Sequence, residues 1–182
     1  MGHKLFCILG ETASGKTTLV ERLCRETGMS QIISYATRPR RDGESNNHIF
    51  VNDDIYEEMK KNDEIAAYTQ IGDFKYWSTM KQLYENNLYV VDAIGLRALE
   101  DLGLEDIDIC SIYINVPFEI RMYRAMKRGD EFSTFLARVE DEAEQFITMK
   151  AHGGFDYAIS NLNEDKAYTV LKHIVEVETV QN

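Results

Sequence analysis

The hydrophobic pattern of the chain alternates between short apolar runs and longer segments with helical spacing. The apolar runs have the length of buried strands and cover residues 4–9, 31–34, 88–92, 109–114 and 155–160. The segments between them carry helical spacing or helix-boundary residues and cover residues 18–27, 95–102, 117–128, 131–150 and 164–177. Since strands that alternate with helices form a parallel sheet with both faces covered, the pattern predicts an α/β fold.

One region interrupts this alternation. Two predicted strands, residues 64–71 and 74–77, flank Gly72-Asp73 and predict a hairpin. Before and after it we expect a strand at 49–51, a helix capped by Asn52 that ends near Lys61, and a helix from Ser78 to Asn86. The hairpin indicates a β-rich lobe, residues 35–80, inserted into a core made of residues 1–34, 81–123 and 151–182.

A phosphate-binding loop connects the first predicted strand to the first predicted helix. It has the spacing G-x-x-x-x-G-K-[ST] and consists of Gly10, Glu11, Thr12, Ala13, Ser14, Gly15, Lys16 and Thr17, with Thr18 opening the helix. The glycines let backbone N–H groups approach phosphate oxygens, and the helix N-terminus adds partial positive charge. Lys16 suits the β- and γ-phosphates, and the Thr17 hydroxyl suits Mg²⁺. The alternative is a chance glycine-rich turn, but the flanking strand and helix favour a nucleoside triphosphate site.

The composition limits the partners of such a site. The 182 residues include 31 acidic and 20 basic side chains, a net charge of −11, which disfavours nucleic acid and anionic membranes as partners. Cys7, Cys24 and Cys110 have no metal-ligand spacing and are expected to be small apolar side chains in a reducing compartment. The first apolar run is too short for a signal peptide, so we expect a cytoplasmic protein.

Arginine clusters stand out against this acidic background. Arg38, Arg40 and Arg41 surround Pro39 in a predicted loop, which favours a second anion site because guanidinium groups match phosphate oxygens in pairs. The alternative is a solvated basic turn. Further along, arginines on both sides of Gly129 predict a mobile lid over the phosphates, residues 124–150; the alternative is a charged helical hairpin on the surface.

A carboxylate ends the buried strand at 88–92. Asp92 stands where a P-loop fold holds Mg²⁺ through water, and the alternative is that it caps the following helix. The residues do not decide between the two.

From the phosphate-binding loop to the last predicted helix the chain resembles the guanylate kinases. The segment Ser34-Tyr35-Ala36-Thr37-Arg38-Pro39-Arg40-Arg41-Asp42-Gly43-Glu44 is similar to the family's S-x-T-T-R-x-x-R-x-G-E segment, and Tyr76-Trp77-Ser78 to its Y-G-S segment. The resemblance implies a P-loop three-layer sandwich with a parallel core sheet, an inserted nucleoside monophosphate lobe and a helical lid. It implies that the base lies against Ser34 and Ser78 and the acceptor phosphate against Arg38, Arg41 and Tyr76. It places Arg124, Arg128 and Arg138 in the lid and Asn161 beside the adenine of ATP.

The chain also differs from the family at positions that contact the guanine base. Ala67 replaces a glutamate, His48 a tyrosine and Trp77 a glycine, and Ile94 or a short deletion stands at a second acidic position. Side chains that hydrogen-bond to a substrate discriminate against a wrong substrate by roughly 10⁴-fold or more, whereas apolar contacts discriminate by about 10–200-fold. The phosphate machinery is therefore retained and the guanine-reading pocket altered. Trp77 would fill the vacated volume, stack on a purine, or belong to the core of the hairpin.

These observations lead to the hypothesis of a nucleoside monophosphate kinase. With ATP and Mg²⁺ it would phosphorylate (d)GMP, with Lys16, Arg38 and the lid arginines carrying the developing charge and no general base. One alternative is a deoxynucleotide or pyrimidine acceptor, and another is a different small phosphorylated acceptor. A third is an inactive protein-binding module, which the retained Lys16 and Thr17 disfavour. We expect a monomer or homodimer.

Overall fold

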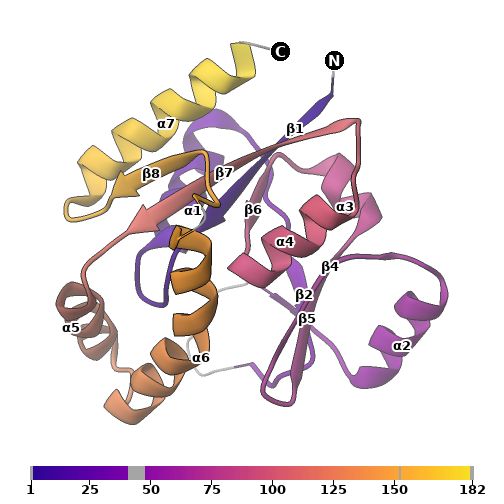
Figure 1. Cartoon of the computed structure of the whole chain (residues 1–182), viewed down its shortest axis with the longest axis horizontal. Coiled ribbons are helices and arrows are strands. Elements are labelled where there is room, and N and C mark those ends of the chain that lie inside the picture. Colours follow the sequence, from indigo (N-terminus) through magenta and orange to yellow (C-terminus); the bar gives the residue numbers. More distant parts are fainter. Residues whose placement is uncertain (1, 41–47, 152, 181–182) are drawn as a thin grey trace.

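The computed structural model of the chain describes residues 2–40, 48–151 and 153–180. Within these residues the strands are β1 (His3–Leu9), β2 (Ser34–Ala36), β3 (His48–Phe50), β4 (Ile65–Ile71), β5 (Phe74–Thr79), β6 (Leu88–Val90), β7 (Ile107–Asn115) and β8 (Tyr157–Ser160). The helices are α1 (Lys16–Thr27), α2 (Asp53–Lys61), α3 (Met80–Glu85), α4 (Ala93–Asp101), α5 (Phe118–Arg128), α6 (Phe132–Ala151) and α7 (Glu164–Val180). Figure 1 shows their arrangement. None of the described helices is long and apolar enough to span a membrane.

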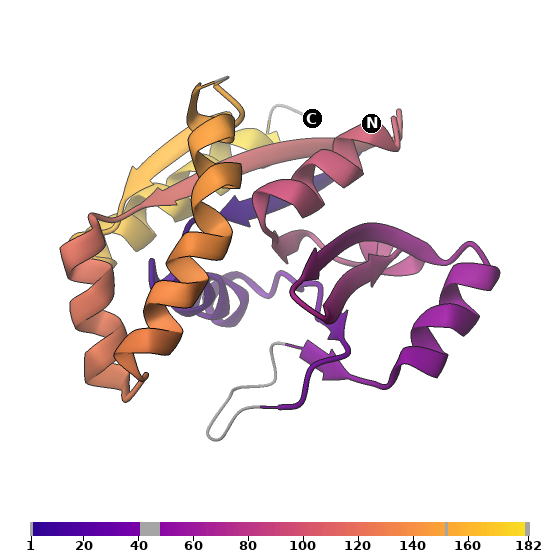
Figure 2. The same cartoon turned by 60° about the horizontal axis from the view of Figure 1, so that its bottom comes forward.

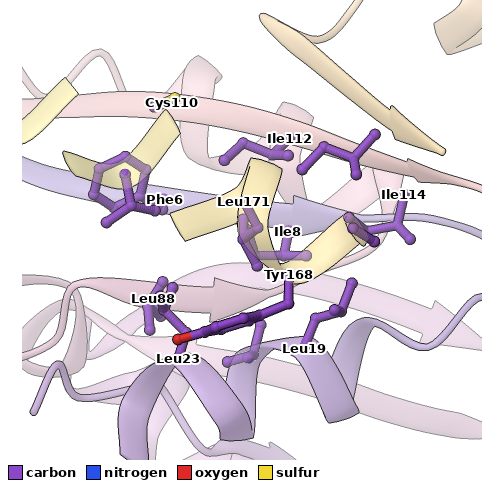
Figure 3. Close-up of a cluster of buried hydrophobic side chains, with 14 of the residues drawn as sticks. Phe6, Ile8, Leu19, Leu23, Leu88, Cys110, Ile112, Ile114, Tyr168 and Leu171 are labelled. Atoms are coloured by element: carbon purple, nitrogen blue, oxygen red, sulfur yellow. The ribbon is translucent and has the colours of Figure 1, made fainter. Parts of the chain in front are cut away.

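The core sheet is parallel, with the strand order β6-β1-β7-β8. Successive side chains of a strand point to opposite faces, so β1 contributes Phe6 and Ile8 to one apolar layer and Leu5, Cys7 and Leu9 to the other. Helices α1 and α7 cover the first face, where Leu19, Tyr168 and Leu171 gather over the strands (Figure 3). Helices α3, α4 and α6 cover the second face. The predicted three-layer α/β sandwich with a parallel core sheet is confirmed.

A second sheet forms the inserted lobe, with the strand order β3-β2-β5-β4. Strands β4 and β5 pair antiparallel as the predicted hairpin, and Gly72 turns it with φ at 58°. Helix α2 begins after Asn52, whose side chain accepts a hydrogen bond from the Ile55 N–H at 3.3 Å, as expected. Figure 2 shows the lobe as a separate layer beside the core sheet. Helix α4 packs against both β4 and the core sheet, which joins the two parts.

Two local predictions are wrong. The strand expected at 31–34 forms instead at Ser34–Ala36 and belongs to the lobe; only Gln31 bridges to Leu88 at the edge of the core sheet. The reason is that Tyr35 and Ala36 pair with β5, which draws the chain away from the core. The helix expected from Ser78 begins after Thr79, which forms a capping box with Gln82.

The core of the lobe is built around Trp77. Its side chain is 1% exposed, stacks on Tyr35 with ring centroids 5.3 Å apart, and meets the edge of Tyr56 at 5.1 Å. Its Nε1 donates to Met59 Sδ at 3.3 Å. Because Tyr76 and Trp77 are neighbours on a strand, they face opposite sides of the sheet. The expectation that Trp77 contacts the substrate is therefore corrected, and the alternative of a hairpin core residue holds.

Replacing Trp77 by alanine should lower the free energy of unfolding by about 3–5 kcal/mol, the range for a large aromatic side chain removed from a packed core. Urea denaturation followed by circular dichroism measures this. The matched control is Phe74→Ala on the same strand, where the side chain is 40% exposed. We expect that control to cost less than about 1 kcal/mol. Equal losses for the two variants would contradict the assignment of Trp77 as the centre of the lobe.

Candidate active site

The phosphate-binding loop owes its shape to two glycines between β1 and α1. Gly10 and Gly15 have φ angles of 148° and 90°. A Cβ atom would come within 2.7 Å of the Ile114 carbonyl oxygen at Gly10 and within 2.6 Å of Asn161 Nδ2 at Gly15. Ala13 also has a positive φ, 61°, which is uncommon for a residue with a side chain. The loop ends at the first residue of α1, so its N–H groups and the helix terminus form one concavity that suits an anion.

Lys16 folds back over this loop. Its ammonium group donates hydrogen bonds to the carbonyl oxygen of Gly10 and, at 3.2 Å, to that of Glu11. Burial lowers the pKa of Lys16, and the carboxylates of Glu142 and Glu11 partly offset that effect. The Lys16 side chain is therefore held at the loop by two backbone carbonyl groups.

Two side chains support the loop from behind. Asn161, which follows β8 and is 2% exposed, donates from Nδ2 to the Ser14 carbonyl at 2.8 Å. Arg124 of α5 donates to the same carbonyl at 3.3 Å and to the Asn161 carbonyl at 2.7 Å. Both residues were predicted to lie at the nucleotide, and the structure brings both to the loop. Arg121 of α5 also reaches it, donating to the Thr12 carbonyl at 3.4 Å.

The other two arginines expected in the lid, Arg128 and Arg138, lie near the turn between α5 and α6. Arg128 Nε donates to Asp130 Oδ1 at 3.0 Å, and Arg138 Nη1 lies 3.6 Å from Asp130 Oδ2. Arg138 also lines the cleft described below, whereas Arg128 does not. The structure therefore places Arg124 and Arg138 at the candidate site and Arg128 beside Asp130.

The lobe contributes a polar wall. Ser34 Oγ and His48 Nδ1 are 2.9 Å apart, and the His48 ring meets the edge of Tyr76 at 5.7 Å. Arg38 is 6% exposed, and its guanidinium lies 5.0 Å from the centre of the Phe50 ring. Ala67 is also buried at this wall. Arg41 lies outside the described residues.

The phosphate-binding loop and the lobe face each other across one cleft of about 260 Å³. Its walls carry residues of the loop, the lobe, the end of β6 and α6, among them Gly10, Thr12, Lys16, Ser34, Arg38, His48, Ala67, Thr69, Tyr76, Asp92, Arg138 and Glu142. Lys16 and Arg38 thus line the same cleft, as a site for two phosphorylated ligands requires.

Trp77 and Ser78 are not on the walls of this cleft. Ser78 is fully buried and its Oγ accepts from the Ala67 N–H at 3.4 Å, so its contact with the base stays a prediction.

Asp92 has a defined structural partner in the cleft. Its Oδ1 accepts from the Gly95 N–H at 2.6 Å, which caps α4, and from Thr69 Oγ1 at 3.0 Å. Burial raises the pKa of this carboxyl, and the two hydrogen bonds oppose the increase. The capping alternative is therefore observed. The role of Asp92 and Thr17 at Mg²⁺ stays a prediction.

The sequence analysis missed Glu142 and Thr69. Glu142 Oε2 accepts from the Thr12 N–H at 2.6 Å, although the two residues are 130 positions apart. Burial raises the pKa of Glu142, and Lys16 opposes this. A helical stripe at 142, 146 and 150 was the available signal, because residues four apart share a helix face. Thr69 shares the inward face of β4 with Ala67, as a period of two requires.

A glycine loop at the end of a parallel strand, an inserted lobe and a helical pair with arginines define a P-loop enzyme for phosphoryl transfer between small molecules. Comparison with known proteins agrees. The chain matches the guanylate kinase family over residues 2–178 and belongs to that family, so it is a kinase.

Individual relatives cover nearly the whole chain. It is 26% identical to the guanylate kinase of Hydrogenovibrio crunogenus over 183 residues, 96% of this chain and 87% of that protein. It is 28% identical to the guanylate kinase of Chlamydia abortus over 188 residues, 98% and 90% of the two chains. Among solved structures, guanylate kinase from Anaplasma phagocytophilum superposes with a TM-score of 0.71 at 21% identity, covering 97% of this chain and 87% of that one. The predicted family and fold are confirmed.

Two glycine variants should separate backbone strain from crowding in the loop. Gly15→Ala and Gly28→Ala both place a side chain at positive φ, but a Cβ meets Asn161 only at Gly15 and nothing within 4 Å at Gly28. We expect Gly28→Ala to cost about 1 kcal/mol of stability and to leave ATP binding unchanged. Gly15→Ala should also weaken ATP binding by about tenfold or more, since displacing Asn161 deforms the loop. Calorimetric titration with ATP measures this; unchanged affinity in Gly15→Ala would refute the support role of Asn161.

Proposed function

We propose that this protein transfers the γ-phosphoryl group of ATP to GMP or dGMP and releases ADP and the corresponding diphosphate. The observation that carries the proposal is the single cleft with the phosphate-binding loop and Lys16 on one wall and Arg38 and Tyr76 on the other. The family supports a guanosine monophosphate as the acceptor, since guanylate kinases are similar to this chain over almost all of its length.

The donor would occupy the loop side of the cleft. The N–H groups at the start of α1 would hold its phosphates, and Lys16 would leave its carbonyl partners to follow the charge of the transferring group. Adenine would lie toward Asn161 and Arg124, which already support the loop at Ser14. These residues would orient the terminal phosphoryl group toward the lobe.

The acceptor would occupy the lobe side. Arg38, together with Arg41 and Tyr76, would bind its phosphate, and the base would enter between Ser34, His48 and the strand that carries Ala67 and Thr69. The acceptor phosphate is already ionised, so the residues need only align it and neutralise charge. Arg138 of α6 is positioned to approach from the lid side, where α6 would also exclude water.

The residues present fit Mg²⁺. The described residues contain no group of three or more histidine, cysteine, aspartate or glutamate side chains able to enclose a metal ion. A Mg²⁺ ion that arrives with ATP retains several waters and takes only one or two protein ligands, which the Thr17 hydroxyl and the second oxygen of Asp92 would supply. When bound, it would neutralise charge on the β- and γ-phosphates.

We also propose that the protein acts in the cytoplasm, as a monomer or homodimer, on free nucleotides. The net charge of −11 supports the absence of a nucleic-acid or anionic membrane partner.

The acceptor is tested by a coupled assay with Mg²⁺-ATP and every nucleoside and deoxynucleoside monophosphate. We expect kcat/KM for GMP or dGMP to exceed that for AMP, CMP and UMP by about 10² or more, because a site that hydrogen-bonds a base edge leaves polar groups unpaired with the wrong base. A pyrimidine monophosphate as the best acceptor would overturn the guanine assignment. No transfer to any acceptor would favour the inactive binding module.

Lys16→Ala should lower kcat by about 10²–10³-fold, the effect of removing one preorganised donor to a developing charge. Binding of GMP should change less than about threefold, because Lys16 lies on the loop side of the cleft. Steady-state kinetics and a GMP titration measure the two quantities. The matched control is Lys166→Ala, an exposed lysine of α7, which should leave both unchanged. Near-normal turnover in Lys16→Ala would refute the proposed donor site.

A further inference from the structure

The phosphate-binding loop already binds an anion from the same chain. Glu142 Oε2 accepts from the Thr12 N–H at 2.6 Å, a short charge-assisted hydrogen bond. Glu142 and Lys16 also line the same cleft, and the carboxylate of Glu142 opposes the lowering of the Lys16 pKa. A backbone N–H of the loop and the lysine of the motif are the groups that a P-loop offers to phosphate. A carboxylate therefore stands among donors suited to the donor phosphates.

The position of Glu142 is fixed by the rest of its helix. Glu142, Phe146 and Lys150 lie four residues apart and share one face of α6. Phe146 is 2% exposed, and its ring lies 5.9 Å from that of Tyr113 on β7. Lys150 Nζ donates to Glu11 Oε1 at 2.8 Å. Figure 1 shows the result, with α6 lying against the loop that follows β1. Glu142 is thus the end of a packed stripe that faces the loop.

Glu142 and a nucleotide phosphate exclude one another at this place. Both are anions, and both would be attracted to the N–H groups of the loop and to Lys16. The Thr12 N–H that Glu142 uses has a single proton to donate. Like charges within a partly buried cleft repel strongly because solvent screens them little. The carboxylate has to leave before, or as, a phosphate takes its place.

We propose that Glu142 is an internal competitor of the donor phosphates and that it determines the apparent affinity for ATP. This inference rests on the proposed function, which assigns ATP to the loop. Only the fraction of molecules in which Glu142 has left the loop accepts the donor, and the measured dissociation constant rises by the inverse of that fraction. Displacement of Glu142 also frees α6 from the loop at its middle, which couples donor binding to the position of the lid.

The test compares ATP binding in variants of Glu142. Glu142→Gln keeps the shape of the side chain and removes its charge, and we expect it to bind ATP about five- to twentyfold more tightly in calorimetric titrations. Adenosine, which carries no phosphate, should bind both proteins equally. Glu144→Gln, two residues along the same helix and exposed, makes the same charge change and should leave the ATP dissociation constant within about twofold. Glu142→Ala repeats the test without the side-chain amide that glutamine would place against the loop.

The outcomes separate this inference from the proposed function. Tighter ATP binding in Glu142→Gln or Glu142→Ala, with adenosine unaffected, supports the competitor. ATP binding that is unchanged or weaker in both variants overturns it, and a simultaneous fall in kcat would make Glu142 a ligand of the substrates instead. If neither the unmodified protein nor the variants bind ATP, the proposed function fails together with the inference.

Discussion

The arrangement of the whole site depends on how the carbonyl oxygen of Ser14 is held. It accepts hydrogen bonds from Asn161 and Arg124, which come from the end of β8 and from α5. Within this loop Ala13 has a φ of 61°, a strained conformation for a residue with a side chain that persists only where the surroundings fix it. The same contacts bring α5, the first helix of the proposed lid, to the start of α1. The shape of the loop thus depends on residues from the C-terminal third of the chain.

Much of the fold follows from local signals. The apolar runs predicted the four core strands apart from their exact ends, because a strand covered on both faces must be apolar throughout. Asn52 marked the start of α2, and the spacing of Gly10, Gly15, Lys16 and Thr17 located the loop before any tertiary contact was known. These features are specified by neighbours in the sequence, so the sequence alone reveals them.

The wrong or missing predictions concern residues whose structure is set by contacts with residues far away in the sequence. Residues 31–34 have an apolar pattern, but pairing of Tyr35 and Ala36 with β5 places the strand later. Trp77 was expected at the substrate because of its position in a motif, whereas its packing partners Tyr35 and Tyr56 lie up to 42 positions away and turn it from the cleft. Glu142 was missed for the same reason. The helical stripe at 142, 146 and 150 indicates a shared face, but only the tertiary structure shows that this face meets Thr12.

The burial of Trp77 makes the lobe accessible to measurement by intrinsic tryptophan fluorescence. It is the single tryptophan among 182 residues, it lies on the side of the lobe sheet away from the cleft, and its indole is 1% exposed. Its fluorescence therefore reports the packing of Tyr35, Tyr56 and Met59 around it and is shielded from direct quenching by a bound base. Tryptophan fluorescence recorded during turnover therefore shows whether the packing of the lobe changes, and no attached dye is needed.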